Sequence, residues 1–240
     1  MRERSNLVLF ASSWLNWILL KILAMKGMFI VAVACLISAA LAVKGVDVSQ
    51  PFSSSTYSCM KSNGVVFSII RGYCSYGGID SHAVEGLNAA RSVGLITDIY
   101  MFPCRGKSAT AQVNEMMAGI PNNLFGMVWI DVETNPSSGC SWSGHDAASN
   151  CAFLQETINA IKAKGKNPGI YSSVYMWETI FGSRAACPGA ASQQLWYAHY
   201  DNNPSFSDFS SFGGWTKPNI KQYQGDTTLC GAGVDLNFYP

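Results

Sequence analysis

The sequence predicts an α/β fold, an irregular TIM-like (β/α) barrel with about eight strands and fewer helices. Short β-branched or apolar runs alternate with longer stretches of helical periodicity, and most short runs end in Gly, Pro or polar residues. This alternation is typical of βα units. Acidic residues follow several runs, which is where a parallel barrel carries its chemistry. The expected strands are Lys44–Val48, Val65–Gly72, Ile96–Phe102, Gly126–Val132, Pro168–Ser172, Gln194–His199, Asn219–Gln222 and Val234–Phe238.

Four helices are expected. The best supported is the third, in which Leu154, Ile158 and Ile161 are spaced to form one buried face, and Gly165 follows as a stop signal. Because the strands outnumber the helices, loops are expected to join the later strands. No internal repeat or low-complexity linker interrupts residues 43–240, which predicts a single domain. The expected helices are Ala83–Ser92, Ala109–Ala118, Asp146–Ala163 and Val174–Ile180.

Residues 1–42 are expected to be an N-terminal extension followed by a secretory signal peptide. Lys26 precedes an apolar run at 28–36 and then small residues up to Ala42, a pattern that suits signal peptidase. Residues 1–24 contain a second apolar run and fit an upstream start codon. The competing interpretation is a membrane anchor, but a span needs roughly 20 apolar residues. Neither run reaches that length without crossing a lysine, so cleavage and export are favoured.

The charge of the expected mature chain is small. Residues 43–240 carry 12 Lys or Arg and 14 Asp or Glu, a net charge of −2. Without a polybasic stretch, the sequence gives no electrostatic case for nucleic acid or anionic lipid as a partner. No stable membrane association is expected once the signal has been cleaved.

Seven cysteines follow the signal, and none stands in a CxxC pair, so zinc ribbons and thioredoxin-type redox sites are not indicated. In an exported chain this count predicts three disulfides and one free thiol. Sequence alone does not give the connectivity, but Cys140 and Cys151 bracket a short loop rich in Ser, Gly and Asn, so we expect them to pair. Cys74, at a strand end, is expected to be free. The seven are Cys59, Cys74, Cys104, Cys140, Cys151, Cys187 and Cys230.

Two acidic residues stand at the end of the expected strand at 126–132. Asp131 and Glu133 point the same way and Val132 is opposed, because side chains alternate along a strand. Two carboxylates on one face of a buried strand repel each other and lose hydration, which raises the pKa of at least one. A glycosidase needs such a pair: a protonated acid for the leaving oxygen and an ionised neighbour for the developing positive charge. Strand-end acids that form salt bridges or cap a helix remain an equal alternative on this motif alone.

Two further acids lie on the first and last expected strands, Asp47 and Asp235. Closing a barrel places these strands side by side, so both carboxylates are expected to face the same pocket as Asp131 and Glu133. Either acid alone is more often structural. Their joint placement favours an active site.

Aromatic residues supply the other half of a sugar site, because flat apolar sugar faces stack on rings. Several fall at or just past the expected strand ends. Packing explains any one of them as well, but the group suits a carbohydrate cleft better than a lipid or nucleotide pocket. The candidate substrate-binding residues are Tyr73, Tyr100, Tyr171, Trp196 and Tyr223, with Tyr197 and Tyr200 at neighbouring positions.

Two other chemistries compete with this one. A cysteine nucleophile needs a thiolate and a base; Cys74 with His82 or His199 offers both residue types, but nothing around Cys74 resembles a nucleophile motif. A metal hydrolase using the same acids with His199 lacks a His pair at ligand spacing. No metal and no cofactor are therefore expected, and His199 is expected to be a hydrogen-bonded structural residue.

Six short blocks lie along the expected strands: Gly45–Ser49, Ile130–Glu133, Gly169–Ser172, Leu195–Ala198, Gln222–Tyr223 and Val234–Asn237. In this order they resemble the family 25 glycoside hydrolases, the Chalaropsis-type lysozymes. The similarity spans nearly all of residues 43–240, and the ordered set is specific although no single block is. The cysteines resemble those of a secreted eukaryotic branch.

The resemblance implies hydrolysis of the β-1,4 bond between N-acetylmuramic acid and N-acetylglucosamine in bacterial peptidoglycan. It implies that Glu133 is the general acid and Asp131 its paired carboxylate. It further implies that Asp47 and Asp235 line the site, Asp47 as a third catalytic residue and Asp235 as a substrate-binding one. The substrate's 2-acetamido group, oriented by Asp131, is one expected nucleophile, and direct attack by a carboxylate is the other. A monomer is expected, either extracellular or in the lumen of a digestive or lysosome-like compartment.

One departure and one rival accompany this prediction. The third expected strand ends Tyr100-Met101-Phe102, where bacterial members often have Tyr-His-Phe, so a contact made by that histidine does not carry over. The rival is a catalytically silent barrel that binds cell-wall glycan as a lectin or decoy. Both candidate catalytic carboxylates are present, which favours the enzyme.

Overall fold

Nine strands and five α-helices alternate along residues 42–240, the part of the chain that the structure, a computed structural model, describes. The expectations for an extension and a signal peptide concern residues outside this range. The strands are β1 (Val43–Val48), β2 (Val65–Cys74), β3 (Gly78–Ile79), β4 (Ile96–Met101), β5 (Met127–Asp131), β6 (Asn167–Ser172), β7 (Gln194–Ala198), β8 (Ile220–Leu229) and β9 (Ala232–Tyr239). The helices are α2 (Ser54–Ser62), α3 (Ala83–Ser92), α4 (Ala109–Gly119), α5 (Ala147–Ala163) and α6 (Val174–Phe181).

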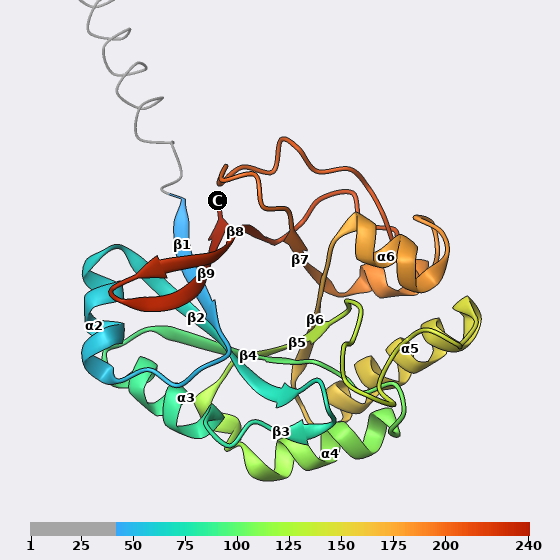
Figure 1. The fold of residues 1–240 in the computed structure, drawn as a ribbon, viewed down its shortest axis with the longest axis horizontal. Coiled ribbons are helices and arrows are strands. Elements are labelled where there is room, and N and C mark those ends of the chain that lie inside the picture. The colour runs from blue at the N-terminus through green and yellow to red at the C-terminus, as the bar shows by residue number, and fades with distance from the viewer. Residues whose placement is uncertain (1–41) are drawn as a thin grey trace, which may run out of the picture. The chain divides into compact units, whose positions relative to one another are not determined.

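Eight of the strands close into a barrel. Their order is β1, β9, β8, β7, β6, β5, β4 and β2, a further pairing of β1 with β2 completes the ring, and the two-residue β3 pairs with β2 outside it. Figure 1 shows the helices around the outside of this ring. The pairings are parallel except where β9 meets β1 and β8 and where β3 meets β2. The predicted irregular (β/α) barrel is confirmed.

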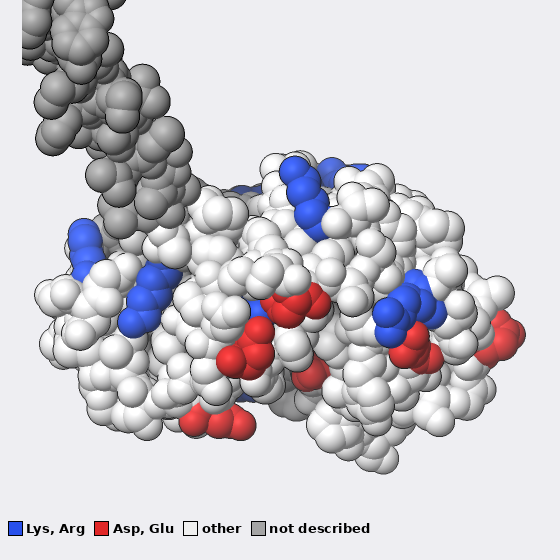
Figure 2. All heavy atoms as spheres, turned by 90° about the horizontal axis from the view of Figure 1, so that it is seen from above, with Lys and Arg blue, Asp and Glu red and all other residues white. Residues whose placement is uncertain are grey.

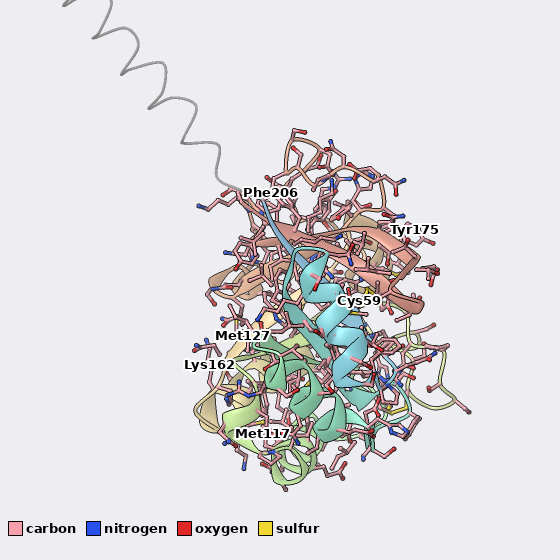
Figure 3. The ribbon with its side chains drawn as sticks, turned by 90° about the vertical axis from the view of Figure 1, so that its left-hand side faces the viewer. Cys59, Met117, Met127, Lys162, Tyr175 and Phe206 are labelled. Atoms are coloured by element: carbon pink, nitrogen blue, oxygen red, sulfur yellow. A yellow bond between two sulfur atoms is a disulfide. The ribbon has the colours of Figure 1, made fainter. Side chains whose placement is uncertain are left out.

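The parallel strands give the barrel two unlike ends. Figure 3 shows Met127, which begins β5, and Tyr175, which follows β6 on α6, at opposite ends of the barrel. Parallel barrels place their functional groups at the end where the strands finish. The end marked by Tyr175 is therefore where the predicted acids should lie.

Local sequence signals set the helix boundaries. The side-chain oxygens of Ser53, Ser108, Asp146 and Ser173 accept hydrogen bonds from backbone N–H groups in the first turns of α2, α4, α5 and α6, as N-cap residues do. Gly182 ends α6 with φ of 73°, a conformation that favours glycine. None of the helices within residues 42–240 combines the length and the apolar composition of a membrane span.

Aromatic and aliphatic side chains fill the barrel interior below the acids. Phe67, Ile69, Trp129 and Trp196 belong to one buried cluster there. Two glycines make room for it: a Cβ at Gly45 would collide with the Phe67 ring, and one at Gly169 with the Trp129 ring. A larger cluster lies between barrel and helices and includes the predicted buried face of α5. The barrel is thus a packed core, which leaves only its end for a site.

The disulfides differ from the predicted pairing. Cys140 bonds to Cys104 and Cys151 to Cys187, so the expected Cys140–Cys151 bridge is wrong. The reason lies in the loop after β5: a hydrogen bond from Arg105 N to Cys140 O holds it against the loop after β4, while Cys151 lies on α5. The third bridge joins Cys59 to Cys230.

Cys74 is the free, buried cysteine of the described residues, as predicted. Figure 2 shows a face on which both charge signs are few and scattered. That face carries no basic stripe, in keeping with the small net charge of residues 43–240.

Candidate active site

Four acidic side chains meet at one end of the barrel. Asp47 on β1 lies directly opposite Asp235 on β9 in the antiparallel register. Asp131 is the last residue of β5, and Glu133 follows two residues later. The charges of Asp47 and Glu133 act on Asp131, and the charge of Asp235 acts on Asp47 and Glu133. The structure therefore brings together the four carboxylates that the sequence indicated.

Asp47 is buried and held by two carboxamides. Its Oδ1 accepts a hydrogen bond of 2.7 Å from Asn237 Nδ2 and one of 2.8 Å from Gln222 Nε2. Burial raises the pKa of Asp47 to about 8, the charge of Asp235 adds to this rise, and the two amide hydrogen bonds oppose it. Near neutral pH this carboxyl group therefore retains a proton much of the time.

Asp131 and Glu133 differ in their surroundings. Asp131 is 5% exposed, and its Oδ1 is buried without a hydrogen-bond partner. Burial raises the pKa of Asp131 well above its usual range, and the charges of Glu133 and Asp47 raise it further. Glu133 is partly exposed, and burial followed by the charge of Asp235 raises its pKa. Both groups thus favour protonation more than an ordinary carboxyl does.

Two cavities border the acids. One of about 700 Å³ is lined by Glu133, Tyr171, Tyr200 and residues of α6. A second of about 330 Å³ is lined by Asp47, Asp235 and residues of β9 and the chain after β1. The site is therefore open on two sides, an arrangement that suits an extended polymer better than a small molecule.

Two of the five candidate substrate-binding aromatic residues join the site, and Tyr197 and Tyr200 at the neighbouring positions also line the larger cavity. Tyr171 is on β6 in register with Asp131, lines the larger cavity, and donates a 2.7 Å hydrogen bond to Gln222 Oε1. Tyr100 lines the smaller cavity, where burial and then the charges of Asp47 and Asp131 raise the pKa of its hydroxyl. Both tyrosines therefore stay protonated around the acids.

Three predicted aromatic residues do not reach the cavities that border the acids. Tyr73 lies on the outside of the barrel, where its hydroxyl donates a 2.6 Å hydrogen bond to Glu115 on α4. Trp196 is 2% exposed within the barrel, where its ring packs edge-on against Tyr171 at 4.6 Å between ring centroids and its Nε1 donates to Asn237. Tyr223 makes no side-chain hydrogen bond to the four acids in the described structure.

Sequence reasoning missed the polar residues that join the acids. Gln222 donates to Asp47 and Asp235 and accepts from Tyr171 and Tyr200. Asn237 donates to Asp47 and accepts from an indole N–H. Both amides lie within the blocks that resemble the lysozyme family, but a neutral amide has no charge signal that marks it.

A second polar cluster lies beside the larger cavity. Ligand atoms of His199, Asp201 and Asp208 fall within 4.8 Å of one another, the one candidate metal-binding group among the described residues. However, Lys221 Nζ contacts Asp201 Oδ2 and Asp208 Oδ1 at 2.7 Å each. This ammonium already supplies the positive charge there, and His199 bonds to Asp208 at 2.6 Å. The geometry therefore supports the structural role predicted for His199.

Cys74 lacks the surroundings of a nucleophile. Burial raises the pKa of its thiol, whereas a reactive cysteine needs a lowered one. In the described part of the chain no hydrogen bond joins its sulfur to a histidine.

Comparison with known proteins places the chain. The family model described as "Lysozyme-like protein 1" matches residues 38–223. The chain is 40% identical over 204 residues to Probable GH family 25 lysozyme 2 of Dictyostelium discoideum, which covers 83% of this chain and 92% of that protein. It is 35% identical over 224 residues to Lysozyme-like protein 5 of Caenorhabditis elegans. The match covers 90% of this chain and 100% of that protein.

Solved structures show the same fold. A family GH25 lysozyme from Aspergillus fumigatus is similar with a TM-score of 0.69 at 21% identity, covering 83% of this chain and 94% of that one. A bacterial lysozyme from Streptomyces coelicolor is similar with a TM-score of 0.69 at 25% identity, covering 82% of this chain and 91% of that one. The chain therefore belongs to the family 25 lysozymes and is a glycoside hydrolase.

Proposed function

We propose that this lysozyme hydrolyses the β-1,4 bond between N-acetylmuramic acid and N-acetylglucosamine in bacterial peptidoglycan, with Glu133 as general acid and Asp131 assisting. The observation that carries the proposal is that, in the described structure, Glu133 faces a cavity and has a raised pKa and an unengaged carboxyl group. It lines the 700 Å³ cavity, burial and the charge of Asp235 raise its pKa, and no hydrogen bond within the described residues engages its carboxyl. Such an acid keeps its proton to higher pH than an ordinary carboxyl and is free to give it to a bound substrate.

The reaction begins with proton transfer from Glu133 to the glycosidic oxygen, as the bond from that oxygen to the anomeric carbon breaks. Asp131 Oδ1 is buried without a partner. When it carries no proton, it is suited to accept the N–H of the substrate's 2-acetamido group. That contact would orient the acetamido oxygen, whose lone pair attacks the anomeric carbon from the opposite face. Water then opens the intermediate and returns a proton to Glu133. Direct attack by a carboxylate remains the alternative nucleophilic step.

Asp47 and Asp235 complete the proposed machinery without transferring the proton. The charge of Asp235 keeps the pKa of Glu133 high. Asp47, with its pKa near 8, limits the number of negative charges in the site. Their side of the site borders the 330 Å³ cavity, which offers room for the glycan on the far side of the cleaved bond.

The proposal extends to the setting of the enzyme. Three disulfides fit an oxidising compartment, which supports secretion or delivery to a digestive or lysosome-like lumen. We propose that the mature enzyme acts there as a monomer, without stable membrane association.

The experiment that tests the proposal replaces Glu133 with Gln and follows the clearing of bacterial wall suspensions. Gln keeps the shape but delivers no proton, so the rate should fall by roughly 10²–10⁴-fold. Thermal unfolding should be unchanged or slightly improved, because one of several repelling acids is gone. Glu85→Gln, a 73% exposed acid on α3, is the matched control and should clear walls at the parent rate. Clearing by Glu133→Gln within about threefold of the parent would overturn the assignment.

The bond is identified by mass analysis of the fragments released from purified peptidoglycan. A muramidase leaves N-acetylmuramic acid at the new reducing end, and reducing N-acetylglucosamine would contradict the proposed bond. The rival, a catalytically silent glycan-binding barrel, predicts binding without fragments. Family membership among the lysozymes supports the enzyme over this rival.

A further inference from the structure

A chain of hydrogen bonds with a fixed direction begins at Trp196. An indole N–H only donates, and Trp196 Nε1 donates to Asn237 Oδ1 over 2.7 Å. The amide of Asn237 is therefore oriented with its oxygen toward the indole and its nitrogen toward Asp47. Asn237 Nδ2 accordingly donates to Asp47 Oδ1 over 2.7 Å. This fixes Asp47 Oδ1 as an acceptor.

Gln222 takes its orientation from that acceptor. Its Nε2 donates to Asp47 Oδ1 over 2.8 Å and to Asp235 Oδ2 over 3.1 Å, which uses both of its N–H groups. A flipped amide would place its carbonyl oxygen against Asp47 Oδ1, already an acceptor for Asn237, and lose that bond. Gln222 Oε1 must therefore face the opposite way, toward Tyr171 and Tyr200.

The two tyrosines are committed in turn. Tyr171 donates to Gln222 Oε1 over 2.7 Å and Tyr200 over 2.9 Å. The two hydroxyls also lie 3.4 Å apart, a longer contact than either bond to Gln222. A hydroxyl has a single proton to donate but two lone pairs, so with both protons on Gln222 Oε1 neither tyrosine has one left for a ligand. Both line the 700 Å³ cavity beside Glu133, and Tyr200 is 56% exposed. The cavity therefore meets these oxygens as acceptors.

We propose that Gln222 is a positioning residue that commits Tyr171 and Tyr200 to accept hydrogen bonds in this cavity, so that the cavity selects hydrogen-bond donors of the glycan. Those donors are its hydroxyls and the N–H of its acetamido groups. Gln222 is 2% exposed and acts through the tyrosines without touching substrate. The inference rests on the proposed function, because it takes peptidoglycan glycan as the ligand.

The test measures binding of soluble, uncrosslinked peptidoglycan strands by calorimetry, with Glu133→Gln protein to prevent turnover. Gln222→Met should weaken binding about three- to tenfold, since the tyrosine protons are no longer held away from the ligand. In a Tyr171→Phe/Tyr200→Phe background the same change should weaken binding by less than about twofold, because no hydroxyl remains to be oriented. Equal weakening in both backgrounds would overturn the proposal.

Two further measurements keep the test decisive. Tyr200→Phe removes one exposed oxygen with little risk to folding, and should weaken binding about two- to tenfold; an unchanged Kd contradicts the proposal. Tyr175→Phe is the matched control, since Tyr175 lines the same cavity and is 71% exposed but has no hydrogen bond to Gln222. The fold-changes in Kd caused by Tyr175→Phe and by Gln222→Met should simply multiply in the double variant, as they do for independent residues.

A clearing assay on the parent enzyme separates the two proposals. If the parent clears walls but Gln222→Met weakens binding equally with and without the two tyrosine hydroxyls, only the role of Gln222 is refuted. If the parent releases no fragments from peptidoglycan, the proposed function fails first.

Discussion

The most exacting prediction concerns Lys221, a fully buried lysine on β8. Its ammonium contacts Asp201 and Asp208 at 2.7 Å each and donates to Ser205 O over 3.0 Å. All three partners lie in residues 199–219, which join β7 to β8 without a helix and supply one wall of the larger cavity. We predict that Lys221→Met loosens this segment and destabilises the protein.

The magnitude follows from the exposure of the partners. Breaking a buried ion pair by removing one member costs about 3–5 kcal/mol, because the other charge stays buried. The side chains of Asp201 and Asp208 are 23% and 18% exposed, so water solvates part of their unpaired charge. We therefore expect a cost at the low end of that range, about 3 kcal/mol. For a domain of this size each kcal/mol shifts Tm by about 2–4 °C. Tm should therefore fall by about 6–12 °C in a calorimetric scan at neutral pH.

The loss should depend on pH. Burial alone would raise the pKa of Asp208, but hydrogen bonds from Lys221 and His199 bring it below the ordinary value of 3.8. The pKa of Asp201 is lowered in the same way, against burial, by Lys221. A native pKa below the unfolded one gives stability that is present above the unfolded value and is lost as pH falls through the native one. The gap in Tm between parent and Lys221→Met should therefore narrow below about pH 4.

Lys164→Met is the matched control, because Lys164 is exposed at the end of α5. Its stability should lie within about 0.5 kcal/mol of the parent. The reasoning is refuted if Lys221→Met melts within 1–2 °C of the parent, about the shift of a neutral surface change. A gap that stays constant from neutral pH to pH ~3 would equally show that the ion pairs are not its cause.

Three more predictions concern the disulfides, the free thiol and the acids. Replacing Cys59 and Cys230 by Ser should cost about 5 kcal/mol, the loop-closure value for 171 residues; denaturant titration measures it, and a cost below about 1 kcal/mol contradicts it. Cys74 is 7% exposed with a raised thiol pKa, so a thiol reagent should label it only after unfolding, and rapid native labelling is the contrary result. Asp235→Asn removes a charge that, after burial, raises the pKa of Glu133. The general acid sets the alkaline limb of the pH–rate profile, so this limb should move to lower pH; an unmoved limb assigns the proton to another group.

The barrel was predictable because its strands are buried on both faces and read as apolar runs. All eight expected strands are present, but two features differ. The helix Ser54–Ser62 escaped notice because only Tyr57 and Met60 are buried on it, too few to produce a periodic pattern. The strand Ile220–Leu229 runs beyond the expected end at Gln222, because its second half pairs with β9 and has few apolar residues.

The acids were predictable and the aromatic contacts only in part, for a geometric reason. A carboxylate at a strand end is expected at the open end of the barrel, because burying its charge elsewhere is costly. An aromatic ring packs equally well on either face of a strand. Tyr73 follows a register shift between Arg71 and Tyr73, and its side chain lies against α4. Trp196 faces inward as expected, but it lies too deep and forms the floor beneath the site. Strand alternation alone gives neither the bulge nor the depth.

Side-chain amides hold two of the four acids, Asp47 and Asp235. Within residues 42–240 no Lys, Arg or His forms an ion pair with Asp47, Asp131, Glu133 or Asp235. A cation would fix their geometry equally well, but it would lower their pKa values and remove the proton that a general acid must donate. Neutral N–H donors also orient a carboxyl, but they lower its pKa less than a cation does. The pKa of Asp47 stays near 8 although two amide N–H groups donate to it. Lys221, the nearby buried cation, instead holds the loop between β7 and β8 through Asp201 and Asp208.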